Sequence, residues 1–195
     1  FKSAVEEALD QPLIIADRFH FCRYIYWAID GVRRRVQANW HDYDWKKCKR
    51  MRYVFYKNSD DLNETDRWYL NRYCQMSKEL KIAYWLKEEF CHWFKQAKKN
   101  GTERIRETKA GLYRFYQLVK KAGIPEFLKA IETFKNWQTE ILNSFDYGYS
   151  NGFLEGINNN TKVMKRNAYG FRNFYRARAR ILLSYKYREI GVHMG

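Results

Sequence analysis

Two acidic positions in this sequence have neighbours of the types that metal-dependent phosphate chemistry requires. Glu155 is followed at helical spacing by Asn158 or Asn159, Lys162 and Arg166, so one helix face would carry a carboxylate, amides and cations. Amides and cations contact phosphates, whereas a carboxylate among them repels DNA unless it holds a divalent metal ion. The alternative is a glutamate that stabilises the start of its helix, with the amides exposed to solvent.

The second acidic position, Asp17, directly follows a short apolar segment. Residues 13–16 read Leu-Ile-Ile-Ala, a pattern typical of a strand that is covered on both faces. Ligands collect at the carboxyl ends of strands in open α/β sheets, so Asp17 is a candidate metal ligand or base, and His20 is placed to orient it or to contact a phosphate. The alternatives are that Asp17 caps the next helix and that His20 is structural.

Three arginines recur every fourth residue after Tyr169 and Gly170. Arg172, Arg176 and Arg180 would form a basic stripe on one face of a helix. Like charges at this spacing oppose helix formation, and contact with phosphates would relieve the repulsion, as would screening by solvent and salt. The opposite face is expected to pack inward through its apolar residues, namely Phe171, Phe174, Tyr175 and Leu182.

The composition favours a polyanionic partner. The 195 residues carry a net charge of +15 with a pI near 9.6, and 18% are aromatic, which is typical of a nucleic-acid-binding protein. Residues 156–195 hold nine Lys or Arg against one acid, and a second basic cluster spans residues 33–35 and 46–52. The concentration of basic residues in these two segments favours a face that binds a polyanion. The alternative is a basic surface that is only solvated.

Several classes of protein are disfavoured. No apolar run reaches the ~18 residues that a membrane helix needs, and the first residues do not resemble a signal peptide. The four cysteines include no C-x-x-C pair and have apolar neighbours, so we expect reduced thiols packed as small hydrophobic side chains in a cytoplasmic protein.

Most of the chain has helical periodicity. Apolar residues recur at helical spacing from Phe21 to about Phe145, with predicted helix starts after Asn63 and at Pro125. Residues 51–56 are ambiguous between strand and helix, and residues 1–9 are predicted to end a helix. The one confident strand, residues 13–16, needs hydrogen-bonded neighbours that the rest of the chain does not offer, so we expect a piece of a longer protein.

The blocks that contain these residues resemble a known family. Asp17-Arg18-Phe19-His20, then Glu155-Gly156-Ile157-Asn158-Asn159 with Lys162 and Arg166, and Tyr169-Gly170-Phe171-Arg172 together resemble the C-terminal part of bacterial insertion-sequence transposases of the ISL3 family. The resemblance covers essentially the whole chain in order and spacing, although residues 40–135 match only in being helical.

The resemblance implies a fold and a reaction. The fold would be mostly α, with part of an RNase H-like α/β core in residues 1–39, an all-α insertion in residues 40–135, and the last catalytic helices with a basic C-terminus in residues 136–195. The complete enzyme would use a DDE triad and two Mg²⁺ or Mn²⁺ ions to cleave DNA and transfer strands, as a homo-oligomer assembled on DNA. Such a fragment would lack at least one metal ligand and would be inactive alone.

The resemblance also assigns roles to individual residues. Glu155 matches the third acid of the triad, and Asp17 is either a second metal ligand or a neighbour of the site. A non-catalytic helical nucleic-acid-binding protein is the alternative function. The expected DNA contacts are Lys162, Lys165, Arg166, Arg172, Arg176 and Arg180, and the expected supporting residues are His20, Asn158, Asn159, Tyr169 and Gly170.

Overall fold

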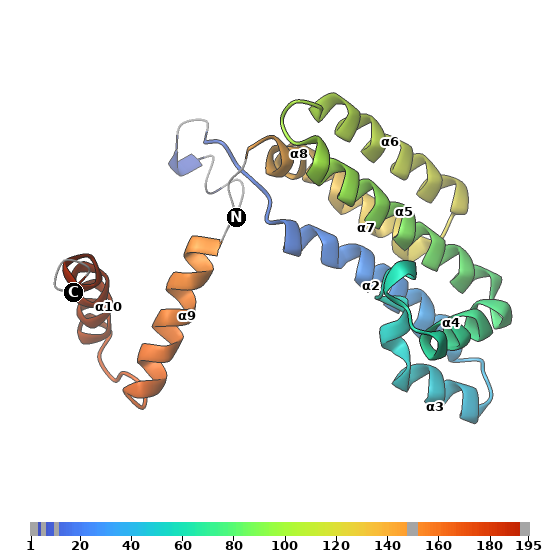
Figure 1. Ribbon diagram of the computed structural model, residues 1–195, viewed down its shortest axis with the longest axis horizontal. Coiled ribbons are helices and arrows are strands. Elements are labelled where there is room, and N and C mark those ends of the chain that lie inside the picture. Colours follow the sequence, from blue (N-terminus) through green and yellow to red (C-terminus); the bar gives the residue numbers. More distant parts are fainter. Residues whose placement is uncertain (1–3, 5–6, 10–11, 148–151, 192–195) are drawn as a thin grey trace. The chain divides into compact units, whose positions relative to one another are not determined.

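The computed structural model describes residues 4, 7–9, 12–147 and 152–191 (Figure 1). The chain divides into two compact units, Phe1–Tyr149 and Ser150–Gly195. Unit 1 contains α2 (Arg18–Gln37), α3 (Asp42–Arg50), the 3₁₀ turns η1 (Arg52–Phe55) and η2 (Ser59–Asp61), α4 (Glu64–Met76), α5 (Lys78–Asn100), α6 (Ile105–Ala122), α7 (Pro125–Asn136) and α8 (Gln138–Asp146). Unit 2 contains α9 (Gly152–Asn167) and α10 (Phe174–Gly191).

Unit 1 is a helical bundle built around its longest helix, α5. This helix packs against α2, α4 and α6, and α2 also packs against α7. The core is rich in aromatic rings, among them Phe21, Phe90, Phe134 and Phe145, which meet edge to face. Burying each such side chain contributes roughly 1.5–3 kcal/mol, so the apolar stripes of these helices account for the bundle.

The helical periodicity of the sequence predicted most of this core correctly. The apolar positions expected on α6 and α7, for example Leu112, Val119, Phe127 and Ile131, are all buried. The sequence pattern places Tyr24, Trp27, Ala28 and Val32 on one apolar side of the helix that follows Phe21. This prediction was partly wrong, because Trp27 is 56% exposed while Ala28 and Val32 are buried. An indole at the margin of an apolar stripe is stabilised there by Arg23, whose guanidinium lies 4.6 Å from the ring centroid.

The predicted helix boundaries also follow from local chemistry. The Asn63 side chain accepts a hydrogen bond from the Asp66 amide at 2.8 Å and so caps α4. Gly123 ends α6 in the left-handed region at φ 67°, and Pro125 then occupies the first turn of α7, where its missing N–H is not needed. The ambiguous segment 51–56 forms the 3₁₀ turn η1.

The strand expected at residues 13–16 is not present in the described part of the chain, which contains no β-strand. The segment is extended, but it lies against α8 instead of in a sheet. The Ala16 amide donates to the Glu140 carbonyl at 2.9 Å, and the Asn143 side-chain amide donates to the Ile14 carbonyl at 2.9 Å. Without a neighbouring strand, the backbone finds partners on a helix, and Leu13 is half exposed.

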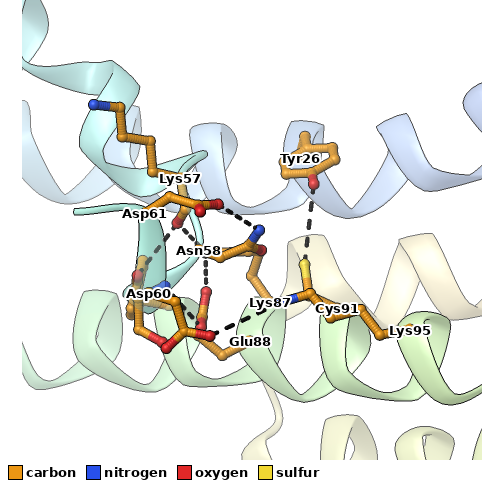
Figure 2. Close-up of polar contacts among 11 residues, drawn as sticks. Tyr26, Lys57, Asn58, Asp60, Asp61, Lys87, Glu88, Cys91 and Lys95 are labelled. Carbon is orange, nitrogen blue, oxygen red and sulfur yellow. Dashed lines mark hydrogen bonds and ion pairs between the residues drawn. The ribbon is translucent and has the colours of Figure 1, made fainter.

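A buried lysine fixes the loop before α4 onto α5 (Figure 2). Lys87 is fully buried, and its ammonium donates to the Lys57 carbonyl at 2.6 Å and to the carboxylate of Glu88. Glu88 also accepts the Ser59 amide at 3.1 Å. Burial alone would raise the pKa of Glu88, but these two donors outweigh burial and lower it, so the buried charges stay paired.

The four cysteines are free thiols, as the sequence indicated. Burial raises the pKa of Cys22 and of Cys48 to about 12, so both are protonated thiols at neutral pH. In the described residues no helix is long and apolar enough to cross a membrane. The helix expected over residues 1–9 lies largely outside the described residues.

Candidate functional site

Asp17 caps α2, which is one of the alternative roles that its sequence position allows. One carboxylate oxygen of Asp17 accepts the Phe19 amide at 2.8 Å and the His20 amide at 3.2 Å. These are two of the donors that the first turn of a helix leaves unpaired. His20 therefore contacts Asp17 through its backbone, while its imidazole is exposed beside the Phe19 ring.

Arg18, which the sequence analysis did not assign to the site, anchors this corner of unit 1. Its guanidinium donates to the Ser144 carbonyl, with the Nε at 3.1 Å, and lies 5.0 Å from the centroid of the Phe145 ring. The start of α2 is thereby tied to the last turn of α8. No local pattern could have shown this contact, because the partners are 126 residues apart.

A cavity of about 560 Å³ lies beside Asp17 within unit 1. Its wall is mainly apolar and combines segment 12–16 with Phe134, Trp137 and Ile141. Asp17 and His20 are among its few polar lining residues. Asp17 therefore both caps α2 and lines the edge of an apolar cavity.

In unit 2, α9 carries the other acid at its start. Glu155 is exposed in the first turn of α9, where a negative charge is favourable at the positive end of the helix dipole. The amides and cations that follow it along the helix are exposed, namely Asn158, Asn159, Lys162, Lys165 and Arg166. Residues of the adjoining face, Ile157 and Met164, are half buried.

A hydrogen bond links the two helices of unit 2. The Tyr185 hydroxyl of α10 donates to the Ile157 carbonyl of α9 at 3.1 Å. The Thr161 hydroxyl donates to the same carbonyl at 2.9 Å. The segment of α9 around Ile157 therefore contacts α10, whereas Lys162 and Arg166 of α9 are exposed.

Tyr169 and Gly170 end α9 in a turn with left-handed backbone. The Gly170 amide donates to the Lys165 carbonyl and the Tyr169 amide to the Arg166 carbonyl, which is the hydrogen-bond pattern of a Schellman motif. Tyr169 has a φ of 51°, a conformation that favours glycine, and its side chain is fully exposed. The turn reverses the chain between the two helices.

Two expectations for α10 were wrong. The helix begins at Phe174, with Asn173 accepting the Arg176 amide at 3.1 Å, so Arg172 precedes the helix and only Arg176 and Arg180 share its face. The aromatic face does not pack inward, since Phe174 and Tyr175 are 74% and 77% exposed. Leu182 is exposed as well, whereas Phe171 is half buried.

The acids of the two units have the right chemistry for a hard divalent cation, because Mg²⁺ and Mn²⁺ prefer carboxylate oxygens. In Asp17 one oxygen already accepts the two cap bonds, and a carboxylate has capacity for further partners on its second oxygen. Across the described residues no three His, Cys, Asp or Glu side chains group closely enough to hold a metal ion.

A family model and several relatives of this chain are transposases. The family model DDE_Tnp_ISL3, described as a transposase, matches residues 1–181. The transposase of insertion sequence IS1557 from Mycobacterium tuberculosis is 26% identical over 87% of this chain and 42% of its own length. The transposase of IS1001 from Bordetella parapertussis is 29% identical over 84% of this chain and 39% of its own length. No solved structure matches the chain.

Another relative has a different name. A protein of Lactococcus lactis subsp. lactis named as an ATP-dependent protease is 34% identical over 66% of this chain and 37% of its own length. The present sequence contains no G-x-x-x-x-G-K-S/T segment of the kind that cradles ATP phosphates. The chain spans about two-fifths of the length of these curated relatives.

Proposed function

Since this chain belongs to the ISL3 family of transposases, we propose that it supplies catalytic and DNA-contacting residues to an enzyme that cleaves DNA and transfers strands. The observation that carries the proposal is the family match over residues 1–181, which includes both candidate acids and the cationic run on α9. The complete enzyme would work on transposon ends and target DNA in the bacterial cytoplasm, as a homo-oligomer assembled on DNA.

Glu155 and Asp17 are the residues of this chain that would hold Mg²⁺ or Mn²⁺. When bound, the divalent ions activate water or a DNA 3′-hydroxyl for in-line attack on a phosphodiester. Glu155 supports this role because it is exposed in the first turn of a helix whose following residues are amides and cations. Asp17 would use the carboxylate oxygen that the cap leaves available.

The cations would position the DNA backbone. Lys162, Lys165 and Arg166 on α9 are exposed, and so are Arg176 and Arg180 on α10. Arg172, in the segment between the helices, is exposed too and would contact a further phosphate. Phosphate contacts fix the register of DNA on a protein, which here would hold a scissile bond near Glu155. Tyr169 and Gly170 support this surface by setting the turn between the helices.

Strand transfer by the complete enzyme tests the proposal. Glu155→Gln keeps the size of the side chain but removes its charge and replaces one acceptor oxygen by an amide donor, so we expect strand transfer to fall at least about a thousandfold with DNA affinity unchanged. The matched control is Glu132→Gln, which alters an exposed glutamate on α7 and is expected to leave activity intact. Equal activity of the Glu155→Gln variant and the native enzyme would remove Glu155 from the site and favour a non-catalytic nucleic-acid-binding protein.

A further inference from the structure

Unit 1 contains a stack of three aromatic rings, of which the middle ring, Tyr73, is buried and the two outer rings, Trp40 and Tyr69, are half buried. Trp40 and Tyr73 stack at 5.6 Å between ring centroids with an interplanar angle of 18°, and Tyr73 and Tyr69 stack at 6.1 Å and 20°. Tyr73 is fully buried, whereas Tyr69 is half buried on α4. The Tyr69 ring is therefore held in place by a packed ring beneath it.

Further aromatic rings and cations surround Tyr69. The Trp68 ring meets it edge to face at 4.9 Å and is itself 57% exposed. The Lys47 ammonium from α3 lies 4.9 Å from the Tyr69 centroid, and the Arg72 guanidinium lies 5.8 Å from the Trp68 centroid. Each ring thus has a cation within the range of an attractive cation–π interaction.

One ion pair joins the two helices that carry these residues. Arg72 on α4 donates to the Asp44 carboxylate on α3 at 2.8 Å. Tyr43, the neighbour of Asp44 on α3, is 66% exposed and lies one helical turn before Lys47. Tyr43, Lys47, Trp68, Tyr69 and Arg72 therefore form one surface, which we name the α3–α4 face.

The two acids of α3 are already paired, whereas Glu64, one turn before Trp68 on α4, is exposed. Asp44 is held by Arg72, and Asp42 is paired with Lys46 at 2.7 Å. In contrast, Lys49, Arg50 and Arg52 are exposed and take part in none of the ion pairs found among the described residues. The excess charge of the basic cluster at residues 46–52 is thus available to a polyanion.

The α3–α4 face lies at one end of unit 1 (Figure 1). α3 and α4 lie beyond the C-terminal end of α2, whereas segment 12–17 and α8 lie at its N-terminal end (Figure 1).

We propose that the α3–α4 face binds an unpaired DNA strand, with bases stacked on Trp68, Tyr69 and Tyr43 and phosphates held by Lys47, Lys49 and Arg50. Rigid aromatic rings interleaved with cations are the combination that binds single strands, because every base has a flat face and every linkage a charge. In a duplex the bases are stacked on one another, so their faces are not available to these rings. The choice of DNA over RNA rests on the proposed function.

Binding of labelled oligothymidylate by the 195-residue chain, followed by fluorescence anisotropy, tests this site. Stacking of one base on an aromatic side chain is worth roughly 1–3 kcal/mol, so Trp68→Ala is expected to raise the Kd about tenfold or more, and Trp68→Phe by about twofold. The matched control is Trp27→Ala, because Trp27 is 56% exposed, lies on α2 and also has an arginine near its ring. This control is expected to leave the Kd unchanged.

A failure of the proposed single-strand site can be distinguished from a failure of the proposed transposase function by comparing single-strand and duplex binding. Binding of a blunt-ended duplex should be unaffected by Trp68→Ala and weakened by Arg176→Ala with Arg180→Ala. If Trp68→Ala and Trp27→Ala have the same effect on oligothymidylate, or if Trp68→Ala weakens duplex binding as much as single-strand binding, the α3–α4 face is not a stacking site. Exclusive binding of oligouridylate would also overturn the assignment to DNA. None of these three results would affect the proposed role of Glu155 in the transposase.

Discussion

The Arg18 guanidinium donates hydrogen bonds to the Ser144 carbonyl, and this contact joins the first turn of α2 to the last turn of α8. Asp17, the preceding residue, caps α2 and is therefore held at the same corner of unit 1. The Asp-Arg-Phe-His block thus has two structural functions, one in the cap and one in the anchor, beside any chemistry that Asp17 performs.

Replacement of Arg18 should weaken unit 1. Arg18→Met keeps the length of the side chain but removes the bonds to Ser144 and the cation over Phe145, so the free energy of unfolding should fall by about 1–3 kcal/mol. Urea unfolding measures this change. Arg23→Met is the control, since Arg23 lies over the exposed Trp27 ring and should matter less. Equal losses for both variants would contradict the anchoring role.

The two roles of Asp17 can be separated by comparing three side chains. Asn caps helices about as well as Asp, so Asp17→Asn should keep the native stability, whereas Asp17→Ala should lower it by about 1 kcal/mol. If Asp17 also binds metal, Asp17→Asn in the complete enzyme should abolish strand transfer despite normal thermal unfolding. Full activity of this variant would show that Asp17 acts only as a cap.

Acid should destabilise unit 1 through the buried pair of Asp30 and Arg33. Asp30 is 7% exposed and its carboxylate accepts two bonds from Arg33, at 2.9 and 2.6 Å. Burial alone would raise the pKa of Asp30, but the hydrogen bonds from Arg33 and Tyr56 outweigh it and lower the pKa. The folded chain then binds a proton less readily than the unfolded chain, whose Asp pKa is about 3.9.

The stabilisation from Asp30 is therefore complete above about pH 4 and is lost as the pH falls through the lowered pKa. Urea unfolding between neutral pH and about pH 2 should show a smaller acid loss for Asp30→Asn than for the native chain, although this variant starts from a lower stability because Arg33 stays buried. Asp42→Asn, at an exposed pair, should leave the acid loss unchanged. The same acid loss for Asp30→Asn and the native chain would contradict this account.

The arginines of unit 2 should determine how DNA binding responds to salt. Removing one phosphate contact should reduce the slope of log K against log salt by about 0.9, so Arg176→Ala with Arg180→Ala should reduce it by about 1.8. Arg178→Ala, on the other side of α10, should leave the slope unchanged. Filter binding to a duplex over a range of salt concentrations provides both values. Identical slopes for the double variant and the native chain would mean that these arginines are only solvated.

The sequence predicted the helices of unit 1 because their signals are local. The spacing of Phe127, Ile131 and Phe134 indicates one buried face, and Asn63 and Pro125 mark helix starts through their own side chains. A helix needs only its own residues to form its hydrogen bonds, so such patterns suffice.

The predictions from sequence failed where contacts between residues far apart in the chain determine the structure. An apolar segment such as residues 13–16 becomes a strand only if another strand pairs with it, and here its partners are Glu140 and Asn143 on α8. The Phe174 and Tyr175 rings were expected in the core, yet both are exposed on α10. The bonds from Arg18 to Ser144 and the aromatic stack of Trp40, Tyr73 and Tyr69 likewise join segments whose proximity is set by the fold.

Metal binding by the complete enzyme tests the central claim most directly. Bound Mn²⁺ can be counted by electron paramagnetic resonance in the native enzyme and in the Glu155→Gln variant, with Glu132→Gln as the control. If Glu155 is a metal ligand, Glu155→Gln should lose at least one bound ion or bind it at least about tenfold more weakly, whereas Glu132→Gln should match the native enzyme. The same number of ions bound with the same affinity in all three proteins would contradict the account.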